Sequence, residues 1–452
     1  MIDMSLESIF RAYDVRGVYG KDLTEDVMFG IGNAVGRFLD TDIVVGRDGR
    51  LSSESLQDAF VKGFINTGRN VTDVGMLPLS VGMLYAWKSK RPFAYITASH
   101  LSKEWNGVKF FHSSGIGFLE EDNKKIKELV LDEGVVEKEE KGRIVQKNRE
   151  EVLRCYEDFL LSKVKAERRI KVVLDCGNGS TGIIARRLFE DGGFDVEVLF
   201  EDVDGNFPNR GPEPSADSLT ELREHSRNAD IGIAYDGDGD RMTVVDDRGN
   251  VLTPEQVSYF ILSELLPKEK GPVVVNVEFT KGIDLIAERF GRKVIRVRVG
   301  HTFLMEAVHK YRACFGSESS GHAVLPSLVP FDDTLAISFY FACLLSRRTE
   351  KLSKIVEGIP EYPFERVNFD LGTDERKIRV MDRIKERLMK EFSDINTLDG
   401  IRVDLKSGWV LIRPSNTSPL IRLTVEADTE EELKRLKSMF SKIVREEMEG
   451  SA

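Results

Sequence analysis

The chain has 452 residues and a formal net charge of −11 at pH 7. This length is enough for several domains with buried cores, and the composition is that of an ordinary globular protein. The acidic balance, without a long Lys/Arg run, argues against a nucleic-acid surface. An anionic ligand must therefore be attracted by local cations.

The four cysteines lie far apart, and no two of them form a C-x-x-C pair. This distribution is typical of reduced thiols in a cytoplasmic protein rather than of a disulfide framework or a zinc site. Residues 1–10 lack the basic and apolar regions of a signal peptide. The longest apolar run, residues 335–345, is shorter than the ~20 residues of a membrane-spanning helix and predicts a buried helix. We expect a cytoplasmic protein without a membrane partner.

Three stretches repeat one pattern, in which a short β-branched apolar run is followed by a glycine-rich or polar turn and a helix-like segment. They are residues 43–50, 171–180 and 272–280. Continuous apolar runs are typical of strands buried on both faces, and their alternation with helices predicts βαβ units in mixed or mostly parallel sheets. The recurrence predicts three similar α/β domains in tandem.

Polar, charged or proline-bearing stretches separate these domains at residues 138–143, 246–250 and 359–363. The predicted domains are residues 1–148, 149–250, 251–362 and 363–452. The last one contains amphipathic helix patterns around residues 376–392 and 430–447, with strand patterns at 409–413 and 420–426. We therefore expect a smaller α+β domain at the C-terminus.

The first candidate site follows the apolar run at residues 93–96 and reads Thr97-Ala-Ser-His100. Loops after the carboxyl ends of strands in open α/β sheets are where ligands bind. A Ser-His pair by itself is more often a turn or a helix cap. Lys109, ten residues after Ser99, could bring a cation back to the same place.

The most informative segment is Asp236-Gly-Asp-Gly-Asp240-Arg241, between the strand-like residues 231–235 and 242–245. Alternate side chains of an extended or tightly looped backbone project the same way, and the glycines allow close approach of the backbone. Asp236, Asp238 and Asp240 can then place three hard oxygen donors around one divalent cation. The segment predicts a site for an ion such as Mg²⁺.

Other interpretations of this segment are weaker. A solvated acidic turn would bring three like charges together with nothing to neutralise them. A calcium EF-hand needs glycine at its sixth position and flanking helices, whereas Arg241 is the sixth residue here and the flanks are strand-like. A phosphatase with a nucleophilic Asp is the serious competitor, although the Thr that usually follows two residues after its second Asp is missing.

Two further polar loops follow strand-like runs. Gly316-Ser-Glu-Ser-Ser-Gly-His322 offers a carboxylate, hydroxyls and an imidazole, which suit the vicinal hydroxyls of a sugar. Arg413-Pro-Ser-Asn-Thr-Ser-Pro419 offers a guanidinium, hydroxyls, an amide and backbone N–H groups, which suit a phosphate. Each loop alone could equally be a structural turn.

Together and in this order, these loops resemble the α-D-phosphohexomutase superfamily, in its phosphomannomutase/phosphoglucomutase branch. Residues 10–17, Phe-Arg-Ala-Tyr-Asp-Val-Arg-Gly, match the opening motif of that family, and the resemblance covers the whole chain. It implies three similar α/β domains with mixed sheets and a smaller C-terminal α+β domain, arranged around a central active-site cleft.

The resemblance also implies roles for individual residues. The groups at the reacting phosphoryl group would be Ser99 as its carrier, with His100, Lys109, Arg241 and Arg16 as the other catalytic residues. Mg²⁺ would be held by Asp236, Asp238 and Asp240 together with a phosphate oxygen on Ser99. The groups that bind substrate would be Tyr13, His301, Glu318, Ser320, His322, Arg413, Ser415, Asn416 and Thr417, with Glu318 and Ser320 on the sugar O3 and O4.

The implied reaction interconverts hexose 1-phosphates and hexose 6-phosphates. Phosphoserine would donate to O1 or O6, and the hexose 1,6-bisphosphate formed is both intermediate and activator. Mannose and glucose phosphates are the expected substrates, because Asn416 fits that branch, whereas phosphoglucosamine mutases commonly have Gly there. We expect a monomer or small homo-oligomer.

Several positions depart from the family pattern. Leu101 and Ser102 replace the usual Asn-Pro, Glu278 replaces a Lys proposed as general acid/base in some relatives, and Met305 replaces another Lys. Lys281 could substitute for the lysine missing at residue 278. A phosphoglucosamine mutase, a hydrolase with an Asp nucleophile, and a catalytically weakened sugar-phosphate-binding homologue therefore remain as alternatives.

Overall fold

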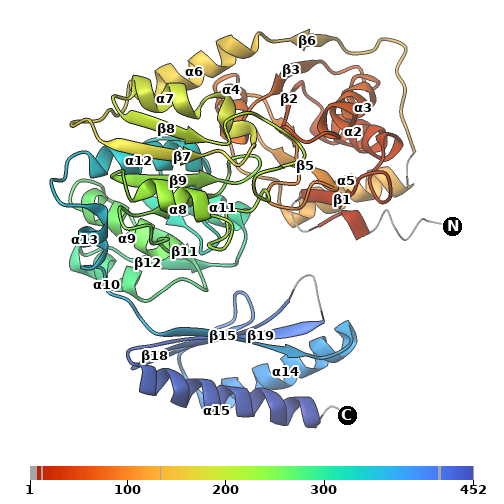
Figure 1. Ribbon diagram of the computed structural model, residues 1–452. Coiled ribbons are helices and arrows are strands. Elements are labelled where there is room, and N and C mark those ends of the chain that lie inside the picture. Colours follow the sequence, from red (N-terminus) through yellow and green to blue (C-terminus); the bar gives the residue numbers. More distant parts are fainter. Residues whose placement is uncertain (1–7, 12–13, 133, 416–418, 451–452) are drawn as a thin grey trace. The chain divides into compact units, whose positions relative to one another are not determined.

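The computed structural model describes residues 8–450 apart from 12–13, 133 and 416–418. Tyr13, Asn416 and Thr417 lie outside these described residues. The chain forms two compact units. Unit 1 comprises Met1–Val257 and Ser320–Glu357, and unit 2 comprises Ser258–Ser319 and Gly358–Ala452. Figure 1 shows the elements of both units in sequence colours.

The first sheet of unit 1 has six strands in the order β1-β5-β4-β2-β3-β6. β2 is parallel to β3 and β4, whereas β5 is antiparallel to both β4 and β1, so the sheet is mixed. The strands are β1 (Asp14–Val18), β2 (Ile43–Arg47), β3 (Val71–Met76), β4 (Phe93–Ile96), β5 (Trp105–Phe111) and β6 (Ile144–Gln146).

Helices cover this sheet and bury its apolar strands. α2, α3 and α5 contribute to one hydrophobic core together with the strands, whereas α4 and α6 pack against each other. Acidic residues in the first turns of α2 and α6, and Asn148 as the N-cap of α6, favour helix formation at these ends. The helices are α2 (Glu25–Leu39), α3 (Ser53–Ile65), α4 (Leu79–Lys88), α5 (Glu120–Asp132) and α6 (Arg149–Leu161).

The second sheet of unit 1 has the order β10-β9-β7-β8. β7 is parallel to β8 and β9, and β9 forms an antiparallel hairpin with β10 in which Tyr235 pairs with Met242. The turn of this hairpin is therefore the Asp-Gly segment. The elements of this part are β7 (Lys171–Asp175), η1 (Ser180–Ile183), α7 (Ala185–Asp191), β8 (Asp195–Leu199), α8 (Thr220–Ser226), β9 (Ile231–Tyr235) and β10 (Met242–Val245).

Unit 1 also contains the segment that returns from unit 2. Its elements are β14 (Ala323–Val324), α12 (Thr334–Leu345) and α13 (Leu352–Val356). The predicted buried helix at residues 335–345 is confirmed, because eleven of the twelve residues of α12 are buried. Among the described residues, no helix is both long and apolar enough to cross a membrane.

In unit 2, β11 lies between β12 and β13 and is parallel to both. The elements are β11 (Val273–Asn276), α10 (Gly282–Arg289), β12 (Val294–Val297), α11 (His301–Tyr311) and β13 (Phe315–Ser317). α9 (Pro254–Leu265) begins in unit 1 and ends in unit 2.

The C-terminal part of unit 2 is an antiparallel sheet in the order β15-β19-β18-β17-β16. Figure 1 shows α14 and α15 on one face of it, where Val410 and Ile412 face their common core. On the other face, Trp409 and Leu411 pack against Val277. The elements are β15 (Phe364–Asp370), α14 (Asp374–Glu391), β16 (Ile395–Asn396), β17 (Ile401–Leu405), β18 (Gly408–Pro414), β19 (Leu420–Ala427) and α15 (Glu430–Glu449).

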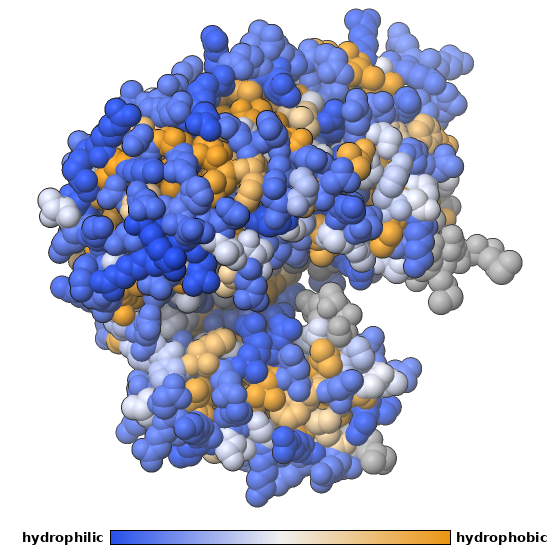
Figure 2. Space-filling view, in the orientation of Figure 1, coloured by the Kyte–Doolittle hydropathy of each residue, from blue (hydrophilic) through white to orange (hydrophobic). Residues whose placement is uncertain are grey.

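The predicted fold class is confirmed, with three α/β parts followed by an α+β part. The predicted helices around residues 376–392 and 430–447 are α14 and α15. The exact domain limits stay predictions. Figure 2 shows many hydrophilic side chains on the visible face with hydrophobic areas between them, while the apolar runs of the strands are buried.

Candidate active site

Ser99 follows β4 in the first sheet and is almost completely buried. Its backbone has a φ of 52°, a left-handed conformation that is uncommon for a residue other than glycine. The Ser99 N–H donates to Thr97 Oγ1 at 2.8 Å. The hydroxyl donates to Asp236 Oδ2 at 2.7 Å and lies 3.2 Å from Asp240 Oδ1. The predicted serine and two predicted metal ligands are thus in direct contact.

The turn between β9 and β10 brings its three carboxylates together. One oxygen each from Asp236, Asp238 and Asp240 lies within 4.8 Å of the other two, and all three residues are buried. Gly239 has a φ of 79°, and a Cβ at Gly237 would lie 2.8 Å from the Ser99 carbonyl oxygen. Glycine is therefore required at residue 239 for the backbone conformation of the turn. At residue 237 it is required so that the loop carrying Ser99, called the serine loop below, can approach closely.

Lys109 of β5 provides a positive charge that neutralises part of the negative charge of the three carboxylates. Its Nζ lies 2.9 Å from Asp238 Oδ2 and also contacts Asp240. Burial opposes the charge on this lysine, but the two carboxylates outweigh burial and raise the pKa of Lys109. In return Lys109 holds the pKa of Asp240 well below its usual range, against the opposing effect of burial. Burial and the adjacent Asp238 raise the pKa of Asp236.

The donor set fits a small divalent cation. Asp238 Oδ1 is buried and has no hydrogen-bond partner among the residues that the structure describes. A buried carboxylate oxygen without a partner is costly, and a metal ion would satisfy it. Three carboxylates with one lysine leave an excess of negative charge, which also favours a cation.

Arg241 and His322 lie beside the cluster. Arg241 Nε is 3.4 Å from His322 Nε2, and Arg241 Nη1 is 3.4 Å from Glu213 Oε2. His322 Nδ1 is hydrogen-bonded to Asp332 Oδ2 at 2.6 Å, which orients the imidazole. Burial and the nearby Arg241 lower the pKa of His100 to about 2, so this imidazole is neutral. His100 Nδ1 is 3.4 Å from Ser99 Oγ.

Arg16 of β1 belongs to the same part of the first sheet. It pairs in register with Gly107 of β5, and its Nε donates to Asp14 Oδ2 at 2.6 Å. Its positive charge contributes to the lowered pKa of His100. Unit 1 therefore brings together Ser99, His100, Lys109, Asp236, Asp238, Asp240, Arg241, His322 and Arg16.

Unit 2 contains a second group of predicted residues. The buried Glu318 accepts a hydrogen bond of 2.6 Å from the Gly300 N–H, immediately before α11. His301, the first residue of that helix, is also buried. The N-terminal end of a helix favours a negative charge, which explains how Glu318 stays buried. Ser320, which is exposed in the turn before β14, is already part of unit 1.

Arg413, at the end of β18, is held by two carboxylates of unit 2. Its Nη1 is 3.2 Å from Glu278 Oε1 and its Nη2 is 3.2 Å from Asp399 Oδ2. The other oxygen of Glu278 is 3.3 Å from Arg366 Nη2. Glu278 is therefore a partner of the predicted phosphate-binding arginine. The Ser415 carbonyl accepts a hydrogen bond of 2.8 Å from Lys377 Nζ.

Lys281, the predicted substitute for the lysine missing at residue 278, is engaged by other groups of unit 2. Its Nζ forms an ion pair with Asp428 and lies 4.4 Å from the centre of the Tyr362 ring, while its N–H donates to Glu426. The structure thus holds this ammonium group in a separate ion pair within unit 2.

Several residues that contact the site were not predicted from the sequence. They are Asp48 and Arg50, which follow β2, and Asp332, which follows the predicted sugar-binding loop. The signal for the first two is the polar turn Gly46-Arg-Asp-Gly-Arg50 at the carboxyl end of a buried strand. This turn belongs to one of the three repeated stretches, which predicted a βαβ unit but no functional site.

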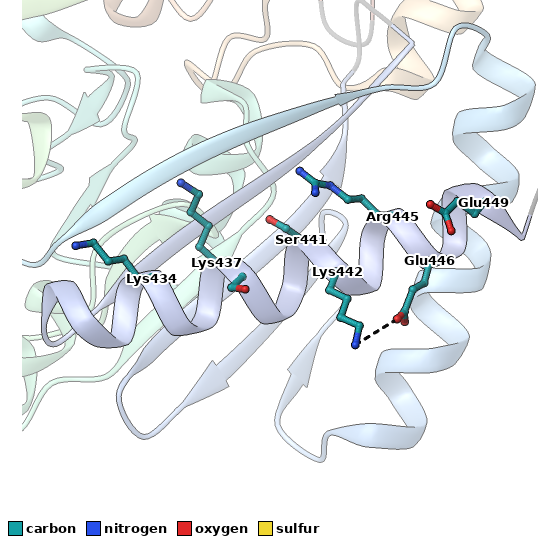
Figure 3. Close-up of a pocket in the computed structure, with 8 residues that line it drawn as sticks. Lys434, Lys437, Ser441, Lys442, Arg445, Glu446 and Glu449 are labelled. Atoms are coloured by element: carbon teal, nitrogen blue, oxygen red, sulfur yellow. Dashed lines mark ion pairs between the residues drawn. The ribbon is translucent and has the colours of Figure 1, made fainter.

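A groove on α15 is separate from these groups. Figure 3 shows the side chains along the helix, with an ion pair of 3.8 Å between Lys442 and Glu446. Its lining is Lys434, Lys437, Ser438, Ser441, Lys442, Arg445, Glu446 and Glu449. None of the predicted site residues lines it.

The fold is that of a multidomain α/β protein. Its site places the hydroxyl of a buried serine against three carboxylates that suit a divalent cation. Models for the phosphoglucomutase/phosphomannomutase α/β/α domains I, II and III match residues 7–135, 154–249 and 253–362, and the model for the C-terminal domain matches residues 375–443. The chain belongs to this phosphoglucomutase/phosphomannomutase family.

Individual relatives agree with the family assignment. The chain is 32% identical to a phosphomannomutase/phosphoglucomutase from Pseudomonas putida, over 96% of this chain and 95% of that protein. It is 34% identical to a probable phosphoglucosamine mutase from Methanopyrus kandleri, over 96% and 97% of the two chains. A solved phosphoglucomutase/phosphomannomutase family protein from Burkholderia thailandensis has a TM-score of 0.90 and 29% identity, with 99% of this chain and 98% of that chain covered.

Proposed function

We propose that this protein is a Mg²⁺-dependent phosphohexomutase that interconverts hexose 1-phosphates and hexose 6-phosphates of mannose, glucose or both. Ser99 carries the phosphoryl group, and a hexose 1,6-bisphosphate is the intermediate and activator. The observation that carries the proposal is the contact of the Ser99 hydroxyl with Asp236 and Asp240 inside a buried triad of carboxylates. Family membership supports it.

Positioning and neutralisation of charge dominate the catalysis of phosphoryl transfer. Asp236, Asp238 and Asp240 would hold Mg²⁺, which when bound offsets negative charge on the phosphoryl oxygens. Lys109 and Arg241 supply further positive charge beside Ser99. Because Asp332 orients the imidazole of His322, that side chain presents a fixed ring nitrogen toward Arg241.

The remaining roles concern the parts of the substrate that do not react. Glu318 and Ser320 would bind the sugar O3 and O4, and His301 would contribute a further polar group. Arg413 and Ser415 would bind the other phosphate, together with Asn416 and Thr417 outside the described residues. A guanidinium suits this role because it gives paired, charge-assisted hydrogen bonds to phosphate.

The test is labelling with glucose 1,6-bisphosphate that carries a radioactive phosphate. We expect acid-stable label on Ser99, and neither label nor mutase turnover in Ser99→Ala. Ser102→Ala, on the exposed part of the same loop, is the matched control and should label normally. Full turnover by Ser99→Ala would overturn the proposal.

Three alternatives give different outcomes. A hydrolase with an Asp nucleophile would form an acyl phosphate that hydroxylamine cleaves, and the sugar would lose its phosphate. A phosphoglucosamine mutase is favoured by the relative from M. kandleri. A coupled assay that compares the 1-phosphates of mannose, glucose and glucosamine distinguishes the substrates, and saturable binding without isomerisation would indicate a catalytically weakened homologue.

A further inference from the structure

Arg50 is a completely buried arginine whose guanidinium lies under the loop that carries Ser99. Its side chain has an exposed fraction of 0%, and the neighbouring Asp48 has 1%. The ring of Phe207, from the second sheet's part of unit 1, lies 5.4 Å from the guanidinium carbon. A buried arginine is retained only when its charge and its N–H groups are satisfied.

Every N–H of this guanidinium has an acceptor. Nε donates to Asp48 Oδ2 at 3.0 Å. Nη1 donates to the carbonyls of Ser102 and Trp105, at 2.8 and 3.0 Å. Nη2 donates to the carbonyls of Ser99 and Leu101, at 2.7 and 2.6 Å. Four of the five donors of this planar group therefore bind four carbonyls of a single turn, and the fifth binds Asp48.

Asp48 connects this clamp to the metal-binding cluster. Its carboxylate accepts hydrogen bonds from Arg50 Nε and from Thr97 Oγ1 at 2.7 Å. The same Thr97 hydroxyl oxygen accepts from the Ser99 N–H and lies 3.0 Å from Asp238 Oδ2. Thr97 therefore accepts a hydrogen bond from the backbone N–H of Ser99, and Arg50 donates one to the backbone carbonyl of Ser99.

This arrangement explains how Ser99 keeps a left-handed backbone, which costs free energy for a residue with a side chain. The conformation aims the hydroxyl at Asp236 and Asp240. Without the hydrogen bonds to its carbonyls, the turn could relax to an ordinary conformation and carry the hydroxyl away from the carboxylates.

We propose that Arg50 is a positioning residue, which fixes the backbone of the phosphate-carrying loop so that the Ser99 hydroxyl stays against the acidic cluster. The proposal rests on the proposed role of Ser99. Arg50 contacts Ser99 only at the backbone carbonyl, and it acts through the loop carbonyls and Asp48.

The test is Arg50→Lys, because lysine keeps the positive charge but has three donors instead of five and lacks the planar fork. Arg402→Lys is the matched control. Arg402 is equally buried, pairs with Asp404 two residues away and donates to the carbonyl of Val277, but it lies in unit 2. Both variants lose a buried guanidinium, and only the first affects the serine loop.

The readouts are the rate of Ser99 labelling by glucose 1,6-bisphosphate, the KM for hexose 1-phosphate, and amide hydrogen exchange in residues 98–105. For Arg50→Lys we expect labelling to slow by about 10- to 100-fold, as for small misplacements of reacting groups. KM should stay within about threefold, because the substrate contacts are intact. Exchange in residues 98–105 should accelerate, whereas Arg402→Lys should match the unaltered protein in all three readouts.

Labelling of Arg50→Lys at the wild-type rate, or equal slowing in Arg402→Lys, would overturn the inference. If Arg50→Lys does not fold, Asp48→Asn replaces it, since that change removes the carboxylate that orients the guanidinium, and a wild-type labelling rate would then overturn the inference. Absence of label in the unaltered protein would refute the proposed function itself. The two failures are therefore distinguishable.

Discussion

Lys109 Nζ lies 2.9 Å from Asp238 Oδ2, so an ammonium group occupies part of the space around the predicted metal ligands. The same ammonium also contacts Asp240. One lysine thus neutralises part of a buried cluster of three carboxylates. A cation that binds the three carboxylates therefore lies close to the positive charge of Lys109.

Replacement of Lys109 by methionine should therefore affect both stability and catalysis. Loss of one partner of a buried ion pair costs about 3 to 5 kcal/mol, and loss of a charge that stabilises the transition state lowers rates by about 100- to 1000-fold. We expect Mg²⁺ to raise the thermal midpoint of Lys109→Met more than that of the unaltered protein. Melting curves in EDTA and in Mg²⁺ measure this, with the exposed Lys103→Met as control. An equal effect of Mg²⁺ on both proteins would contradict it.

Asp238→Asn tests the metal site with almost no change in shape. Asp238 Oδ1 has no hydrogen-bond partner within the described chain, so this oxygen is available to an ion. Removal of one ligand charge should raise the Mg²⁺ concentration for half-maximal activity by roughly tenfold or more. Titration of EDTA-treated protein with Mg²⁺ gives this value. Asp246→Asn, at a buried carboxylate in the turn after β10, should leave it unchanged.

Glu278→Gln tests whether this carboxylate competes with substrate phosphate for Arg413. Glutamine can keep a hydrogen bond to Arg413 but loses the charge. We expect KM for hexose phosphates to fall by about 3- to 10-fold, equivalent to roughly 1 kcal/mol. Two arginines hold Glu278, so we expect it to take no part in proton transfer and the value of kcat to stay within about threefold.

Steady-state kinetics of Glu278→Gln and of the exposed control Glu288→Gln decide this point. A large loss of kcat with unchanged KM in Glu278→Gln would instead assign Glu278 to the transfer of a proton.

Asp333→Asn should change the pH dependence of stability. Burial raises the pKa of Asp333 from 3.8 to about 7, and its carboxylate accepts from the hydroxyl of Tyr156 and the N–H of Ala336. Between about pH 4 and 7 the folded protein holds a proton that the unfolded chain releases, so stability falls as pH rises through this window. Asparagine has no charge to bury and avoids this loss.

The urea midpoint of Asp333→Asn relative to the unaltered protein should therefore increase between pH 5 and pH 8. The gain should correspond to at least about 1 kcal/mol, because each unit of pKa represents about 1.4 kcal/mol. The exposed Asp58→Asn is the control and should show no such difference. An identical pH profile for Asp333→Asn and the unaltered protein would contradict the prediction.

The sequence alone determined the features that depend on neighbouring residues. Alternation of Asp and Gly between two apolar runs predicts the hairpin turn with its convergent carboxylates, because side-chain direction and glycine freedom are local properties. The apolar run at residues 335–345 predicts the buried α12 for the same reason. Five motifs in the order typical of the family were enough to identify the resemblance, since each motif is a short contiguous stretch that can be recognised in the sequence directly.

Only the tertiary structure decided which distant groups meet. Ser99 contacts Asp236 across 137 residues, and Arg413 contacts Glu278 across 135. The clamp of Arg50 on the serine loop and the pairing of His322 with Asp332 likewise need the packed sheets and loops. Strand and helix periodicity specifies which face of an element is buried, whereas the partner on that face depends on how the elements pack. The sequence thus indicated the chemistry of the groups, and packing determined how they are oriented and neutralised.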